Sequence, residues 1–184
     1  KQNQITKEIN CNLYPPQKEA LYCLNEDWEG IGLLNMPCSL GKTIVFAHHL
    51  KQSSYKHILV VSPLRVHAKQ MKKRLEPFLN KRYKSLLVDS DYDGVLDTDD
   101  IFSYLNKTNC LISTTYDSFE NIFIDKFKEL ENSLLIIDEA HNINDNIKSV
   151  IIDYDKVLLV TATPVNILET EDIYCETLYT YPLS

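Results

Sequence analysis

The amino-acid sequence predicts an α/β fold in which helices cover both faces of a parallel sheet. Two observations predict it: short apolar runs rich in β-branched residues recur along the chain, and segments with helical spacing lie between them. Strands and helices that alternate in this way form right-handed βαβ crossovers. Ligands bind such sheets beyond the carboxyl ends of the strands, so functional residues are expected there.

Six segments are interpreted as buried strands, because each is a short apolar run with polar or turn-forming residues at both ends. They span residues 31–36, 57–62, 85–89, 109–113, 133–138 and 156–161. Two segments between them have apolar residues three or four positions apart, which predicts a helix with one apolar face in each. The first contains Leu64, Ala68, Met71, Leu75 and Phe78, and the second contains Tyr116, Phe119, Phe123, Phe127 and Leu130.

The length of 184 residues and the hydrophobic content of 44% suit one compact domain over residues 1–184. The chain starts with Lys1 rather than Met, and residues 179–184 are interpreted as a strand or linker that leads onward. We therefore expect a fragment of a longer protein. No apolar run is long enough to cross a membrane and the first residues lack the pattern of a signal peptide, so no membrane partner is expected.

The cysteines are odd in number, widely scattered and without a C-x-x-C pair. They are Cys11, Cys23, Cys38, Cys110 and Cys175. This pattern argues against a disulfide framework, a disulfide-linked partner and a zinc site. The protein is expected to be intracellular, and the sequence does not distinguish nucleus, cytoplasm and viral replication compartment.

Charge is segregated along the chain, so the net charge of −7 decides little about a nucleic-acid partner. Eight of the 19 basic residues lie between positions 65 and 84: Arg65, Lys69, Lys72, Lys73, Arg74, Lys81, Arg82 and Lys84. Six aspartates lie between positions 89 and 100, a stretch interpreted as an exposed loop. Two interpretations of the basic run stay open, a solvated helix face and a surface that contacts phosphates.

The first predicted strand leads into the segment MPCSLGKT, which has the order strand, phosphate loop and helix. Backbone N–H groups at the start of the helix can surround the phosphates of a nucleotide. Lys42 can neutralise the β- and γ-phosphates, and the Thr43 hydroxyl can hold Mg²⁺. Met36 departs from the pattern, which has its first glycine at this position. The other loop residues in the candidate site are Pro37, Cys38, Ser39, Leu40 and Gly41.

The strand over 133–138 ends in the tetrapeptide Asp-Glu-Ala-His, with Asp138 and Glu139 side by side. Asp138 can coordinate Mg²⁺, and Glu139 can orient or deprotonate the water that attacks the γ-phosphate. The alternative is an ordinary helix start with acids in its first turn. Chance occurrence of both motifs in one chain of this length is on the order of one in a hundred thousand. Together they predict a nucleoside triphosphate site.

With these motifs the sequence resembles the superfamily 2 helicases and translocases. It is most similar to their DEAH-bearing branch, which includes type III restriction enzyme subunits. Further motifs follow in the family's order over nearly the whole chain: LYPPQ at 13–17, VSPLR at 61–65, TYDS at 115–118 and TATP at 161–164. The resemblance implies an N-terminal RecA-like P-loop NTPase domain that uses ATP and Mg²⁺. It also implies that Gln17 reads the adenine edge, and that Tyr14 stacks on the base where relatives often have arginine.

The resemblance further implies contact with one strand of DNA or RNA through its phosphates. The residues that would make it are Ser62, Arg65, Thr114 and Thr115. His141, Thr161 and Thr163 would couple the ATP site to the nucleic-acid site.

The function that follows is the ATP-binding half of a helicase that couples ATP hydrolysis to unwinding or translocation. A second RecA-like domain of the full-length chain would supply arginines, which contribute about 10³ to 10⁵ in rate, so the fragment alone is expected to hydrolyse ATP slowly. One alternative is a translocase that follows double-stranded DNA without unwinding it. Another is a nucleotide- or nucleic-acid-binding module without hydrolysis, which the departures at Met36 and Tyr14 suggest.

Overall fold

A single parallel sheet organises the computed structural model, which describes residues 12–81, 83–89, 98–124, 126–163 and 174–182. The described strands follow the order β3-β4-β2-β5-β6-β1-β7, and every neighbouring pair is parallel. Their bounds are β1 Gly30–Asn35, β2 His57–Ser62, β3 Tyr83–Val88, β4 Asn109–Thr115, β5 Ser133–Asp138, β6 Lys156–Thr161 and β7 Cys175–Thr180. The predicted α/β class with a parallel sheet is therefore confirmed.

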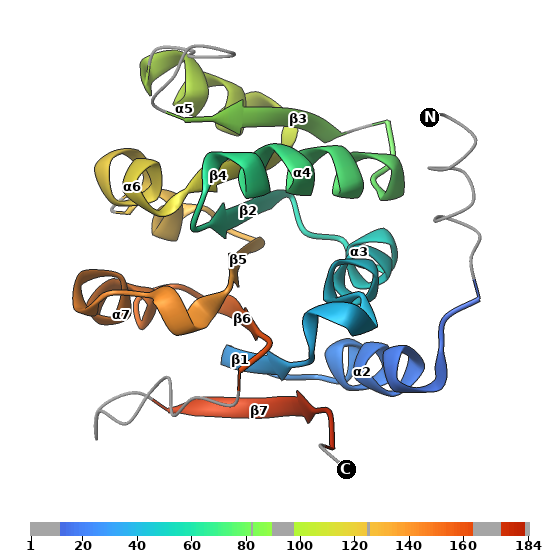
Figure 1. Cartoon of the computed structure of the whole chain (residues 1–184). Helices are drawn as coiled ribbons and strands as arrows, with labels where there is room; N and C mark the ends of the chain where they lie inside the picture. The colour runs from blue at the N-terminus through green and yellow to red at the C-terminus, as the bar shows by residue number, and fades with distance from the viewer. Residues whose placement is uncertain (1–11, 82, 90–97, 125, 164–173, 183–184) are drawn as a thin grey trace.

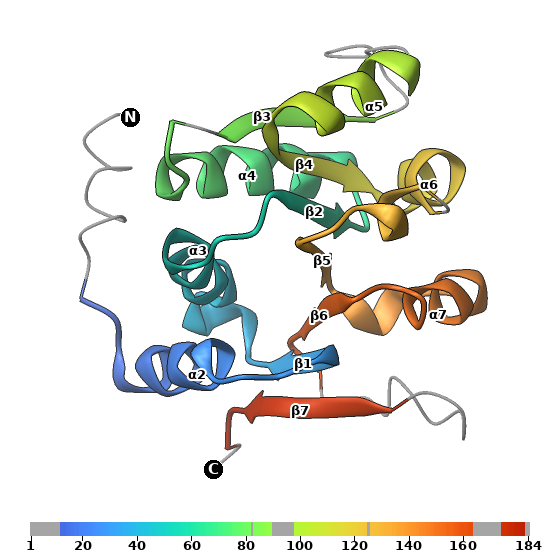
Figure 2. The ribbon, with the colours of Figure 1, turned by 180° about the vertical axis from the view of Figure 1, so that it is seen from behind.

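Helices cover both faces of this sheet, as Figures 1 and 2 show from opposite sides. One face carries α2 (Pro15–Asn25), α3 (Lys42–Gln52) and α4 (Arg65–Leu75), followed by the short turn η2 (Glu76–Phe78). The other carries α5 (Thr98–Lys107), α6 (Tyr116–Ser118) and α7 (Asp145–Ile151), with the turns η3 (Phe119–Phe123) and η4 (Phe127–Glu129). Two further short turns, η1 (Cys38–Leu40) and η5 (Ala140–Asn142), lie next to the ends of β1 and β5.

Two apolar cores result, one on each face of the sheet. In β2, Ile58 and Val60 contribute to the core under α2, α3 and α4, whereas Leu59 and Val61 contribute to the core on the opposite face. All four are fully buried. Because both faces are covered, the inner strands are continuous apolar runs rather than alternating ones, which is why they could be recognised in the sequence.

The predicted strand bounds agree with the structure for β2, β5 and β6 and differ by one or two residues elsewhere. The largest consequence is in β4, which continues to Thr115 and therefore includes Thr114 and Thr115. Within the described residues, no helix is long and apolar enough to span a membrane. Predictions about Cys11, Arg82, Pro164 and the aspartates between 91 and 97 lie outside the described residues.

The prediction of one regular helix over 116–130 was wrong. The chain forms one turn of α-helix, then a π-helical turn in which the Ile124 N–H donates to the carbonyl of Phe119 (3.0 Å), and later the 3₁₀ turn η4. Residues spaced by four drift around an ideal α-helix, which has 3.6 residues per turn, and a wider turn corrects that drift. The rings of Phe119, Phe123 and Phe127 are consequently all fully buried.

Of two other segments, one differs from its prediction and one agrees with it in part. Asp99 and Asp100 do not lie in a loop but in the first turn of α5, where the helix dipole favours carboxylates. Residues 179 and 180, interpreted as part of a strand or linker, form the end of β7, which pairs with β1 and shifts register between Leu33 and Leu34. Gly32 allows this approach, because a Cβ atom there would lie 2.5 Å from Cδ1 of Leu178.

Candidate functional site

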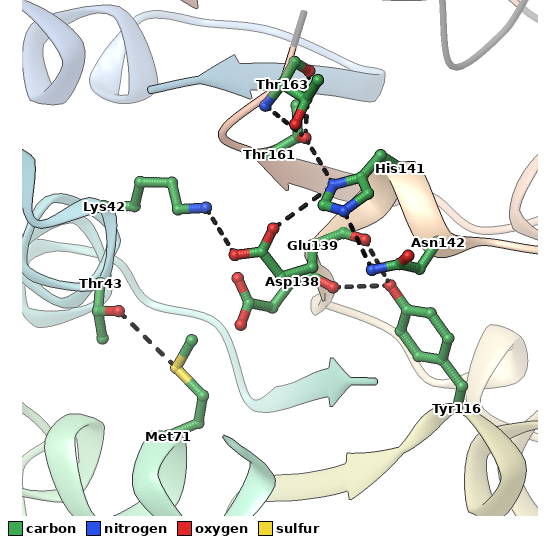
Figure 3. A network of polar contacts seen from close by, with 10 residues as sticks. All are labelled: Lys42, Thr43, Met71, Tyr116, Asp138, Glu139, His141, Asn142, Thr161 and Thr163. Carbon is green, nitrogen blue, oxygen red and sulfur yellow. Dashed lines mark hydrogen bonds and ion pairs between the residues drawn. The ribbon is translucent and has the colours of Figure 1, made fainter. Parts of the chain in front are cut away.

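Three segments converge at the carboxyl edge of the sheet, where Figure 3 shows their side chains. The phosphate-loop segment leaves β1, the Asp-Glu-Ala-His segment leaves β5, and Thr161 ends β6, which lies between them. The Nζ atom of Lys42 lies 3.1 Å from Oε1 of Glu139, although 97 residues separate them in sequence. The two motifs that the sequence singled out therefore face one another in the structure.

The phosphate loop is shaped by the turn η1 and by Gly41, which is left-handed (φ 71°, ψ 47°) at the start of α3. A Cβ atom at Gly41 would lie 2.9 Å from Nε2 of Gln17, so both the left-handed conformation and the close approach of Gln17 favour glycine here. Met36 continues the ladder between β1 and β6, its N–H donating to the carbonyl of Thr161 (2.9 Å), and its side chain is buried in the core. This packing explains why an apolar residue can stand where the general pattern has glycine.

Lys42, Asp138 and Glu139 form the charged centre of the site. The ammonium of Lys42 is almost buried, and Glu139 bridges it to His141, whose Nδ1 lies 3.4 Å from Oε2. Burial raises the pKa of Asp138, and the nearby charge of Lys42 opposes that rise. Glu139 is one of two non-glycine residues with a positive φ in the described part of the chain (φ 51°, ψ 48°). Such strain is typical of functional sites.

A pocket of about 170 Å³ opens beside this centre. Its walls include Gly41, Lys42, Thr43, Asp138 and Glu139 on one side and residues of α4 on the other, namely His67, Gln70, Met71 and Arg74. The contribution of α4 was not predicted, although positions 67, 70, 71 and 74 have the three- and four-residue spacing that places side chains on one face of a helix. The described residues contain no cluster of three or more His, Cys, Asp or Glu side chains for a metal ion. Thr43 and Asp138 suit Mg²⁺, which keeps several waters and binds through one or two protein groups plus phosphates.

Gln17 is buried (5% exposed), and both atoms of its amide are in use. Its Oε1 accepts a hydrogen bond from the N–H of Tyr14 (2.9 Å), and its Nε2 donates to the carbonyl of Leu40 (2.8 Å). Gln17 therefore ties the start of α2 to the phosphate loop. Tyr14 as a whole residue is 70% exposed, so a base has room to stack on its side chain.

Of the four residues expected to touch nucleic acid, only Arg65 presents its side chain to solvent. Thr114 is fully buried and its hydroxyl donates to the carbonyl of Val88 (2.7 Å). Thr115 is also buried, and its hydroxyl accepts from the N–H of Ser118 at the start of α6. Ser62 is fully buried at the end of β2, and its hydroxyl has no partner among the described residues. In this structure the side chains of Ser62, Thr114 and Thr115 are buried at the ends of their strands, and the two threonine hydroxyls bond to their own chain.

The three residues expected to couple the sites lie together. Nδ1 of His141 is 3.2 Å from the hydroxyl of Thr161, which in turn bonds both the N–H and the carbonyl of Thr163 at 3.2 Å (Figure 3). A fourth residue, Tyr116, was missed. Its hydroxyl lies within hydrogen-bond distance of the backbone carbonyls of Asp138 and Glu139. Its place in the helical apolar pattern of 116–130 favoured a core role, and the adjacent Thr-Tyr motif was the one signal that pointed to the site.

Comparison with known proteins agrees with this geometry. The sequence profile of the family described as "Type III restriction enzyme, res subunit" matches residues 10–166. No protein of curated function matches the sequence significantly.

Among solved structures, a nuclease-deletion mutant of the type ISP restriction-modification enzyme LlaGI, in complex with a DNA substrate mimic, superimposes with a TM-score of 0.64 at 21% identity. The Pyrococcus furiosus Hef helicase domain gives 0.63 at 17% identity, and the UvsW helicase from bacteriophage T4 gives 0.57 at 16%. These matches cover 91%, 92% and 82% of this chain but only 19%, 38% and 52% of those chains, respectively. The chain therefore belongs to the type III restriction enzyme res-subunit family and forms a superfamily 2 helicase-like, N-terminal ATP-binding domain.

Proposed function

We propose that this domain binds Mg²⁺-ATP and couples its hydrolysis to translocation on nucleic acid or to its unwinding. The observation that carries the proposal is the convergence of Lys42, Thr43, Asp138 and Glu139 on one pocket from the ends of separate strands. Phosphoryl transfer needs a cation for the phosphates, oxygen ligands for Mg²⁺ and a group that orients the attacking water. The pocket holds candidates for each of these roles.

The contacts at Lys42 suggest the order of events. Without nucleotide, the Lys42 ammonium is held by Glu139 at 3.1 Å. The β- and γ-phosphates of ATP compete for Lys42, so binding frees the Glu139 carboxylate to accept a proton from water. Thr43 and Asp138 would hold Mg²⁺, which neutralises charge and polarises the phosphate oxygens when bound. The raised pKa of Asp138 describes the ligand-free site, and an adjacent divalent cation would favour the ionised carboxylate.

The nucleobase would lie beside the start of α2. The exposed ring of Tyr14 provides a stacking surface, whereas the amide of Gln17 is already bonded to Tyr14 and Leu40. We therefore propose that Tyr14 contributes affinity for the base and that Gln17 acts mainly by holding the phosphate loop. Base selectivity through Gln17 would use its second amide hydrogen and second lone pair.

Nucleic acid would pass over Arg65 and the outer face of α4. This face forms a groove of about 540 Å³ against β3, and its walls include Lys69, Lys72 and Lys73 together with Glu76, which pairs with Lys72 (3.6 Å). Lysines arranged in this way contact phosphates without reading sequence. Strong local positive charge can therefore outweigh the negative net charge of the chain. The LlaGI structure holds a DNA substrate mimic, which favours DNA over RNA as the partner.

The complete motor is proposed to need more than this domain. A second RecA-like domain would supply the arginines that speed phosphoryl transfer by about 10³ to 10⁵, so this domain alone would turn over slowly. Likeness to restriction enzymes favours a second candidate, translocation along double-stranded DNA without unwinding. The presence of both Lys42 and Glu139 in the pocket argues against a module that only binds nucleotide. We place this activity inside the cell or in a viral replication compartment, where nucleic acid and ATP occur together.

The decisive test is a titration of Mg²⁺-ATP and Mg²⁺-ADP against thermal stability, with Lys42→Ala beside it. Ligand at about 100 times its dissociation constant stabilises a folded protein by roughly 2.7 kcal/mol. We expect a rise in melting temperature that Lys42→Ala abolishes and that the control Lys148→Ala keeps, because Lys148 pairs with Asp145 on the surface of α7. Absence of any shift in the unsubstituted protein would contradict ATP binding. A strand-displacement assay on the full-length protein then separates unwinding from translocation.

A further inference from the structure

The hydroxyl of Tyr116 joins two parts of the molecule that the sheet keeps apart. Tyr116 begins α6, directly after β4, whereas Asp138 ends β5 and Glu139 follows it, and β2 lies between these two strands. The Tyr116 O–H donates to the carbonyl of Asp138 (2.7 Å) and also lies 3.0 Å from the carbonyl of Glu139 (Figure 3). Burial raises the pKa of Tyr116, so the hydroxyl remains a donor throughout the physiological range.

The backbone that accepts these bonds is the strained part of the site. Glu139 has a left-handed conformation, and this turn brings two successive carbonyls to one donor. The same turn directs the Glu139 carboxylate toward Lys42 and His141. A residue with a Cβ atom does not hold this conformation unless its surroundings stabilise it. Tyr116 is one of those surroundings, together with the Asn142 N–H, which donates to the carbonyl of Glu139 (2.9 Å).

The position of Tyr116 is fixed in turn by the end of β4. Thr115 immediately precedes it and caps α6 by accepting a hydrogen bond from the Ser118 N–H (3.3 Å). β4 is the neighbour of β2, which leads into Arg65 and the basic face of α4. A strand bound along this edge would lie beside the end of β4, which carries Tyr116 directly after it.

We propose that Tyr116 is a positioning residue that links nucleic-acid binding at the ends of β2 and β4 to the orientation of Glu139. This inference rests on the proposed function and adds a second connection to it. The contact between His141 and Thr161 reaches the Glu139 side chain from β6, whereas Tyr116 holds the Glu139 backbone from β4. Movement of α6 would turn the carboxylate without changing the phosphate loop.

The test compares Tyr116→Phe with the unsubstituted full-length protein in steady-state ATPase assays, with and without saturating DNA. Loss of one positioning hydrogen bond should lower kcat with DNA about tenfold. The KM for ATP should stay within about twofold, because Tyr116 is not among the residues that line the nucleotide pocket. The ratio of DNA-stimulated to basal turnover should fall toward one.

Tyr154→Phe is the matched control. The hydroxyl of Tyr154 is also buried and also donates to backbone carbonyls, those of Ile124 (3.0 Å) and Phe123 (3.4 Å), but it lies outside the site. This variant should lose a similar amount of thermal stability and keep the unsubstituted ratio of stimulated to basal turnover.

Three results would overturn the proposal. One is an unchanged ratio in Tyr116→Phe while Glu139→Gln abolishes turnover, which leaves the proposed function intact. Another is a parallel loss of ATP affinity, kcat and melting temperature in Tyr116→Phe beyond that of Tyr154→Phe, which would mean a purely structural role. The third is an unsubstituted protein that turns over no ATP with or without DNA, which removes the proposed function as well.

Discussion

Replacing Glu139 with glutamine is expected to tighten ATP binding about tenfold while it abolishes turnover. Lys42 must leave Glu139 before it can bind phosphate, and the two side chains are only 7% and 21% exposed. A hydrogen bond to a charged group contributes roughly 1.5–3 kcal/mol, against about 0.5–1.5 kcal/mol for a neutral one. The ammonium stays charged, so a bond from Lys42 to glutamine lies near the low end of the range of roughly 1.5–3 kcal/mol and the present ion pair near its high end. Lys42 is then released at a cost lower by about 1–1.5 kcal/mol, and 1.4 kcal/mol is tenfold in affinity.

Calorimetric titrations with Mg²⁺-ATP and Mg²⁺-ADP measure this effect directly. If release of Lys42 is the cause, ADP should gain affinity as well, because its β-phosphate also needs the ammonium. If relief of repulsion between Glu139 and the γ-phosphate were the whole cause, only ATP would gain. Glu120→Gln is the control: Oε1 of Glu120 accepts from the amides of Asn144 and Asn146, outside the pocket, so its loss should leave both affinities unchanged.

This reasoning would be refuted if Glu139→Gln bound both nucleotides no more tightly than the unsubstituted protein does. It would mean that the contact between Lys42 and Glu139 does not compete with phosphate.

Three further predictions concern the charges and the packing around the site. Because burial raises the pKa of Asp138, its contribution to the stability of the ligand-free protein is present at low pH and is lost as pH rises through the folded-state pKa. Asp138→Asn should raise the melting temperature at pH 7 and remove part of that pH dependence, as thermal melts from pH 4 to 8 would show. The double variant Lys69→Gln, Lys73→Gln should reduce the slope of log affinity against log salt by about 1.8, at roughly 0.9 per lost phosphate contact, measured by DNA-binding titrations. Gly32→Ala should destabilise the fold by about 1–3 kcal/mol through its clash with Leu178, and Leu178→Ala should restore part of that loss in urea unfolding.

Much of the architecture could be predicted because the inner strands are buried on both faces. A short, continuous apolar run such as 57–62 fits few structures other than a buried strand. The bounds of β2, β5 and β6 followed from the bounds of such runs. The helix α5 was missed, since its buried residues Ile101 and Leu105 stand beside a run of aspartates that suggested a loop. The π turn at Phe119–Phe123 was missed because spacing by four residues is shared by regular and widened helices.

The contents of the site were only partly predictable, for a different reason. Residue type indicated that Lys42 and Asp138 should meet, because few other arrangements explain both motifs. Residue type could not indicate that Thr114 is buried, since a threonine hydroxyl can be satisfied by a carbonyl of its own chain, here that of Val88. The role inferred for Tyr116 depends on a contact between the start of α6 and the end of β5 that no local pattern encodes.

A laboratory selection of this domain for heat resistance alone would enrich substitutions of Glu139. Glutamate with φ near 51° stores about 1–2 kcal/mol that glycine or asparagine would largely relieve. The selected variants would have a larger free energy of unfolding and would lack the carboxylate proposed to orient water. Substitutions enriched there, compared with those enriched under a selection for ATP turnover, would map where the chain gives up stability for chemistry.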